Sequence, residues 1–183
     1  VMSIENAKSD GVGADLFKDI EDTVSITLYD VNKIPDEAFA SKKHNVGTTA
    51  INDIVPSSLQ SVSFMKDIVE FGETPFANSK NIAGVGFYGE GDSSGASDSN
   101  PYYWSSNGII YSYTGLDSDG KEKIAIEECL PSRGESGGNT TVEPENDADL
   151  SRVNSIKDKA FMNCDSIKSF DLSSAESLRE ISK

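Results

Sequence analysis

The chain has 183 residues and a formal charge of −15, from 31 acidic and 16 basic side chains. This acidic excess argues against binding to nucleic acid or to anionic lipid, because both partners require a basic face. At 183 residues the chain is long enough for one sizeable core and too short for two comfortable domains, and its 36% of hydrophobic residues indicates a folded chain that is not rich in core. No apolar run approaches the roughly 18–20 residues that span a bilayer, so we expect no membrane insertion.

The N-terminal part predicts one strand. Residues 24–28 alternate apolar and polar side chains and are partly β-branched, as in a half-buried strand. Phe17 precedes this strand and Ile34 follows it, so residues 17–38 form one expected structural unit. Residues 1–10 lack the basic-then-apolar layout of a signal peptide. If the protein is secreted, we expect the signal to be absent from this sequence.

Three short stretches share one pattern, in which an apolar residue is followed by an acidic residue two positions on and by Phe five positions on. They are residues 34–39, 71–76 and 156–161. After Phe76 and Phe161, apolar residues recur at the same offsets, and Asn78 corresponds to Asn163. Recurrence of such a unit predicts a solenoid, in which each repeat buries its apolar face against its neighbours. We expect a single domain, residues 1–183, with repeats near 17–38, 39–75, 76–100 and 150–183. Each Phe should be followed by a short helical turn and then a strand.

The region between the second and third copies predicts a different structure, an antiparallel β-meander near residues 102–127. The dipeptide Asn107-Gly108 lies between two apolar runs, which is the strongest short signal for a hairpin. A second turn at residues 115–120 leads into a third apolar run. Residues 89–100, rich in Gly, Ser and Asp, and the polar residues 131–149 are predicted to be loops.

Few motifs in the chain could carry chemistry. Gly84 to Gly89 match G-x-G-x-x-G, but they fall in a predicted strand and not at the start of a helix, so we interpret the match as chance. The two cysteines are too few for a disulfide scaffold or a zinc site. Cys164 stands at the repeat position of Ser79, which favours a small buried thiol, although a single bridge between Cys129 and Cys164 stays open.

Residues 134–138 are similar to the nucleophile loop of trypsin-like proteases. A protease would need Ser136 within hydrogen-bond reach of the lone histidine, His44, which lies in a polar run. Asp117 and Asp119 resemble part of a calcium loop, but Ile126 occupies the position of the distal Glu. The sequence therefore predicts no catalytic residue, no cofactor and no metal site.

An aromatic cluster in the meander is the best candidate for a contact with a partner. Its members are Tyr102, Tyr103, Trp104 and Tyr113. Aromatic side chains are enriched at binding hot spots and can stack on sugars. The alternative, which we favour for most of them, is that they alternate across the meander and pack its base onto the core.

Residues 156–172, and less closely residues 71–87, resemble the BspA-type leucine-rich repeat of bacterial surface proteins. Residues 107–131 are similar to the hairpin insert that is common between such repeats. Phe71 and Pro75 depart from the usual Ile and Ala. The resemblance implies an α/β repeat solenoid, a right-handed superhelix with short parallel strands and an inserted antiparallel meander.

The resemblance also implies an exported bacterial protein. Such a protein would lie outside the cell or on its surface and would mediate protein–protein contacts or adhesion without catalysis, with an extracellular protein or glycan as partner. The alternative function is a carbohydrate-binding module or an accessory domain of a glycan-processing surface protein. An exposed, coplanar Trp104 and Tyr pair would favour that alternative.

Overall fold

The computed structural model describes residues 2–4, 24–40, 43–46, 49–52, 58–89, 100–135 and 138–182. Residues 17–23 of the first expected repeat, most of the loop expected at 89–100, and Ser136 lie outside these residues. The described part is built from short strands and turns. The elements are β1 (Met2–Ile4), β2 (Ser25–Leu28), β3 (Lys33–Ile34), β4 (Lys43–Val46), β5 (Thr49–Asn52), β6 (Ser61–Phe64), β7 (Glu70–Phe71), β8 (Gly84–Phe87), β9 (Tyr103–Ser106), β10 (Ile109–Leu116), β11 (Glu122–Cys129), β12 (Thr141–Val142), the 3₁₀ helix η3 (Ala148–Arg152), β13 (Val153–Ile156), β14 (Ser169–Phe170) and β15 (Glu180–Ile181).

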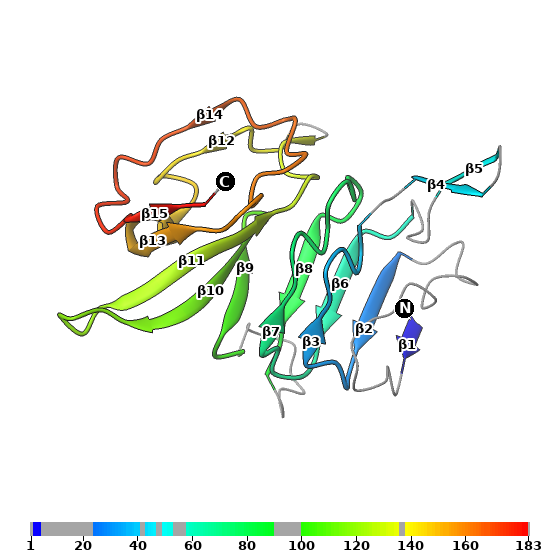
Figure 1. Cartoon of the computed structure of the whole chain (residues 1–183), viewed down its shortest axis with the longest axis horizontal. Helices are drawn as coiled ribbons and strands as arrows, with labels where there is room; N and C mark the ends of the chain where they lie inside the picture. Colours follow the sequence, from blue (N-terminus) through cyan, green and yellow to red (C-terminus); the bar gives the residue numbers. More distant parts are fainter. Residues whose placement is uncertain are drawn as a thin grey trace.

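The N-terminal half is a parallel sheet in the order β1-β2-β6-β8 (Figure 1). The strands pair in register, so that Leu28, Phe64 and Phe87 face one another across the sheet. A second parallel ladder joins β3 to β7 and places Ile34 beside Phe71. In β2, β6 and β8 alternate residues are buried, as the pleat of a strand requires. Residues far apart in the sequence thus build one apolar interior.

The three Phe-centred stretches form equivalent turns, and those around Phe39 and Phe76 lie in adjacent layers. The rings of Phe39 and Phe76 stack with centroids 5.1 Å apart and planes 8° apart. Two residues before each Phe of the three stretches, the backbone takes the left-handed conformation, with φ of 54° at Glu37, 45° at Thr74 and 57° at Lys159. The same unusual backbone at the same place marks these stretches as one structural unit used three times.

The helical turns expected after each Phe are not present, and no α-helix occurs in the residues that the structure describes. The chain instead makes consecutive tight turns. Ser79 N–H donates to Phe76 O (3.0 Å) and Ile82 N–H to Ser79 O (3.1 Å). The reason is backbone geometry, because Asn78 and its counterpart Asn163 both have φ of 62°, which ends any right-handed helix at that point. The prediction of helical turns in an α/β solenoid is therefore wrong for the described residues.

This geometry predicts different effects on stability for two small substitutions at one exposed position. Asn78→Ala should lower the free energy of unfolding by about 1 kcal/mol, because Ala adopts the left-handed conformation at a cost of roughly 1–2 kcal/mol. Asn78→Gly should be neutral or slightly stabilising, since Gly has no such cost. Urea unfolding of both variants measures the difference. Equal stability of the two variants would contradict the observed backbone.

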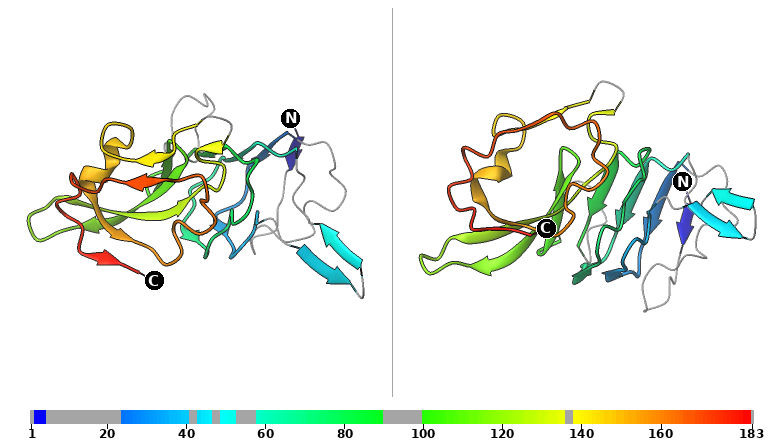
Figure 2. Two further views of the ribbon diagram at one scale, coloured as in Figure 1. Left: turned by 90° about the horizontal axis from the view of Figure 1, so that it is seen from above. Right: turned by 45° about the horizontal axis from the view of Figure 1, so that its top comes forward.

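The predicted meander lies between the N-terminal sheet and the C-terminal strands. β9, β10 and β11 pair antiparallel, with the Asn107-Gly108 turn joining the first two, and β11 continues in parallel to β13 and β15. Figure 2 shows this arrangement from two further directions. Strand β10 separates two apolar cores. Ile110 packs into the core of the N-terminal layers, whereas Ile109 and Tyr111 pack into a second core with β11 and β13.

Strand β11 also takes the place of a repeat layer. Lys157 N–H donates to Ile126 O (3.0 Å), as Gly72 N–H donates to Ile34 O (2.7 Å). Cys129 N–H donates to Ala160 O (2.6 Å), as Phe39 N–H donates to Pro75 O (2.7 Å). Cys129 therefore occupies the position that Phe holds in the other layers.

Because a layer intervenes, Phe161 does not continue the ring stack of Phe39 and Phe76. It packs in the second core and meets Phe170 edge-on, with centroids 4.8 Å apart.

Residues 131–149, expected to be a polar loop, contain buried structure. Thr141 and Val142 form β12, which pairs in parallel with β14, and the Val142 side chain is fully buried. This segment covers the second core and is not a free loop.

Candidate interaction surface

The structure divides the predicted aromatic cluster between the two faces of β9. Tyr103 points to the first core, where its ring stacks on Phe71 at 5.6 Å and tilts against Phe87 at 6.1 Å. Burial, with a smaller contribution from the charge of Glu127, raises the pKa of Tyr103 to about 12. Tyr103 therefore serves packing and keeps its proton at physiological pH.

Trp104 points the opposite way, to the second core. Its ring stacks on Tyr111 with centroids 5.7 Å apart and planes 17° apart. The indole Nε1–H donates to Asp149 Oδ2 at 3.0 Å, and Arg152 Nη1 lies 3.2 Å from the other oxygen of this carboxylate. Trp104 thus anchors η3 to the meander. Its ring does not form the exposed, coplanar platform that a sugar would need.

Tyr102 and Tyr113 are the two members that stay at the surface. Tyr102 is 45% exposed and Tyr113 is half-buried. The two residues are neighbours across β9 and β10, because Tyr113 N–H donates to Tyr102 O at 2.8 Å. Asn100 Oδ1 accepts from the N–H groups of Tyr102 (2.8 Å) and Tyr103 (3.0 Å), which fixes the start of β9. Tyr102 and Tyr113 together form what we call the tyrosine pair.

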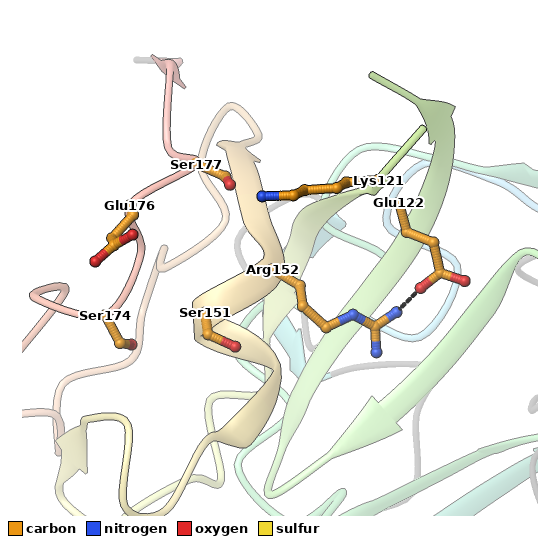
Figure 3. A pocket seen from close by; sticks show the side chains of 7 residues that line it. All are labelled: Lys121, Glu122, Ser151, Arg152, Ser174, Glu176 and Ser177. Carbon is orange, nitrogen blue, oxygen red and sulfur yellow. Dashed lines mark hydrogen bonds and ion pairs between the residues drawn. The ribbon is translucent and has the colours of Figure 1, made fainter. Parts of the chain in front are cut away.

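A polar pocket of about 520 Å³ lies between the start of β11, the end of η3 and the segment before β15 (Figure 3). It is lined by Lys121, Glu122, Ser151, Arg152, Ser174, Glu176 and Ser177. Two cationic and two anionic side chains balance in it, and Arg152 is already paired with Glu122 and Asp149. Such a lining can hydrogen-bond a polar group. The sequence held no signal for it, because three distant segments meet there.

Other candidate chemistry finds little support in the described residues. They contain no group of three or more His, Cys, Asp and Glu side chains that could hold a metal ion. The Asp117 carboxylate accepts from the N–H groups of Asp119 (2.9 Å) and Lys121 (2.8 Å), so it shapes the turn between β10 and β11. The backbone of His44 lies in β4, opposite Ile51. Within the described part, no helix is long and apolar enough to cross a membrane.

One acidic side chain is buried where the N-terminal layers meet β11. Glu128 is 2% exposed, and its two carboxylate oxygens lie 3.1 and 3.2 Å from Phe76 N, which donates to them. Burial raises the pKa of Glu128 to about 8. In the neighbouring layers a backbone carbonyl, that of Pro75 or Ala160, accepts the equivalent bond. The Glu128 side chain therefore substitutes for a backbone acceptor in this layer.

A buried ion pair lies next to the hairpin turn of the meander. Arg133 Nη1 and Nη2 donate to Asp147 Oδ1 (2.8 Å) and Oδ2 (2.6 Å), and both side chains are almost fully buried. The same guanidinium donates to Asn107 O (2.7 Å) in the hairpin turn and to Thr141 O (2.6 Å) in β12. One side chain thus ties three segments together.

Layers of short strands in parallel ladders, closed by the same Phe-centred turn, define a repeat protein. Within this class, residues 147–183 match the family described as "BspA type Leucine rich repeat region (6 copies)". This match confirms the resemblance to the BspA-type leucine-rich repeat inferred from the sequence. No curated protein and no solved structure matches the chain.

Proposed function

We propose that this protein is a non-catalytic binding module that acts outside the cell or at the cell surface, through protein–protein contacts or adhesion. The family match over residues 147–183 is the observation that carries the proposal. Repeat proteins of this kind present extended surfaces that bind other proteins. The acidic charge supports a partner that is neither nucleic acid nor anionic lipid.

We further propose that residues 1–183 form one domain, a right-handed solenoid in which the meander near 102–127 interrupts repeats near 17–38, 39–75, 76–100 and 150–183. The parallel ladders β1-β2-β6-β8 and β11-β13-β15 support this arrangement. The position of β11 also supports this arrangement. Because β11 takes the place of a repeat layer, the series of stacked layers continues through the meander.

We assign the partner contact to the tyrosine pair, with Tyr103 and Trp104 packed against the two cores on opposite faces of β9. Exposed Tyr side chains offer a large contact area at low conformational cost. Further along β10, at its last residue, Leu116 is 56% exposed. A protein partner would thus meet tyrosine and aliphatic surface together.

The tyrosine pair can be tested by substitution. The double variant Tyr102→Ala, Tyr113→Ala should weaken binding about 30-fold if the pair is a hot spot worth roughly 2 kcal/mol. Binding would be measured by biolayer interferometry against a panel of purified extracellular matrix and plasma proteins. Tyr29→Ala is the matched control, because Tyr29 is 49% exposed on another part of the molecule. Equal loss in both variants, or no binding by the wild type to any member of the panel, would contradict the proposal.

The carbohydrate-binding alternative receives less support than protein binding. Trp104 is half-buried, with one ring face stacked on Tyr111 and Nε1–H bonded to Asp149, so it does not form an exposed platform together with a second surface tyrosine. A glycan array run with the wild type and the double variant separates the two functions. Binding to a glycan that the double variant loses, without binding to any protein, would favour the alternative.

A further inference from the structure

The two cysteines of the chain lie in contact across adjacent layers. Cys164 Sγ donates to Cys129 O at 3.0 Å, although the residues are 35 positions apart. Both are buried, with Cys129 at 0% and Cys164 at 8% exposure. A hydrogen bond with the Cys164 thiol, together with burial, raises the pKa of Cys129. The two sulfur atoms are therefore neighbours within the second core.

The repeat explains how this contact arises. Two layers earlier, the Ser79 hydroxyl donates to Phe39 O, and this bond is equivalent to the one that the Cys164 thiol makes to Cys129 O. Ser79 and Cys164 both stand three positions after the Phe of their own turn. Because Cys129 replaces Phe in the preceding layer, a second thiol stands where a benzyl ring would otherwise be. Because the chain has two cysteines, only this pair of layers can be joined by a disulfide.

We infer that Cys129 and Cys164 form a disulfide that locks β11 to the C-terminal repeat when the protein folds in an oxidising environment. The 3.0 Å contact between Cys164 Sγ and Cys129 O places the two residues side by side, and a disulfide bridges residues whose Cα atoms lie roughly 4.4–6.8 Å apart. The chain has no third cysteine to compete.

The reaction is a thiol–disulfide exchange with a low-molecular-weight disulfide such as oxidised glutathione. One cysteine thiolate attacks the glutathione disulfide, forms a mixed disulfide and releases one glutathione thiolate. The second cysteine thiolate then attacks the protein sulfur and releases the other. The two protein thiols lose two protons and two electrons, and glutathione gains them. Since burial and raised pKa suppress the thiolate in the closed molecule, the exchange takes place during folding.

The test is refolding from urea in buffers of graded reduced and oxidised glutathione, followed by alkylation under denaturing conditions and peptide mass spectrometry. We expect a monomer that is lighter by two hydrogen atoms, carries no alkyl group and yields a peptide joining residues 129 and 164. Its melting temperature should exceed that of the reduced form by about 5–15 °C, because the bridge closes a long loop.

The control is Cys164→Ser, whose hydroxyl can donate to Cys129 O as Ser79 does to Phe39 O. Its melting temperature should not depend on the glutathione ratio. Three results would overturn the inference: two alkylated cysteines in folded wild type under excess oxidised glutathione, glutathione adducts without a bridge, or a bridged form less stable than the reduced form.

Discussion

The wild type should lose much of its stability as the pH rises, and replacing Glu128 by Gln should remove this loss. Glu128 has a folded-state pKa of about 8, above the value of about 4.3 expected in the unfolded chain. The folded state therefore holds this proton more tightly, and its stabilisation is complete below the unfolded-state pKa and is lost as the pH rises towards 8. Within this window, each pH unit lowers the free energy of unfolding by at most about 1.4 kcal/mol.

The measurement is urea unfolding at several pH values. Between about pH 5 and pH 8 the free energy of unfolding of the wild type should fall by about 2–4 kcal/mol more than that of Glu128→Gln. The amide oxygen of the Gln variant can still accept from Phe76 N–H. Glu145→Gln makes the same change in charge at an exposed position and should keep the slope of the wild type. Parallel curves for the wild type and Glu128→Gln would show that Glu128 is not buried as described.

Breaking the Arg133–Asp147 pair should have the other large effect. Arg133→Met leaves the Asp147 carboxylate buried without its cation, and removal of one partner from a buried pair costs about 3–5 kcal/mol. It also removes the donors to Asn107 O and Thr141 O. The hairpin turn and β12 would lose their common anchor.

Denaturant unfolding of three variants separates the causes of this loss. The double variant Arg133→Met, Asp147→Leu should regain part of the stability, because no isolated charge then stays buried. Arg152→Met is the control, since Arg152 pairs with Glu122 and Asp149 at the surface and such pairs contribute about 1 kcal/mol or less. A cost for Arg133→Met no larger than that of Arg152→Met would contradict the buried pair.

Local patterns in the sequence were sufficient to predict several of the strands. The alternation at residues 24–28 corresponds to β2, and the Asn107-Gly108 hairpin joins β9 to β10 as predicted. The alternation of Tyr103 and Trp104 likewise indicated that most of the aromatic cluster packs inward. These features depend on side-chain period and turn chemistry, which neighbouring residues determine.

Other features depend on partners distant in the sequence. The left-handed backbone at Asn78 and Asn163 replaced the expected helical turns, and single residues of this kind give a weak sequence signal. Glu128 is one of 31 acidic residues, and nothing near it in the sequence distinguishes it as buried. Strand β11 was not recognised as a repeat layer because Cys129 follows Ile126 by three residues, whereas Phe161 follows Ile156 by five.

A crystal structure of the chain would test the layered repeat most directly. We predict stacked rings of Phe39 and Phe76, with the next layer provided by β11 and with Cys129 in the place of Phe. We also predict that both oxygens of Glu128 accept from Phe76 N–H. A structure in which residues 122–129 lie apart from the ladder of turns, with Phe161 stacked directly on Phe76, would contradict these predictions.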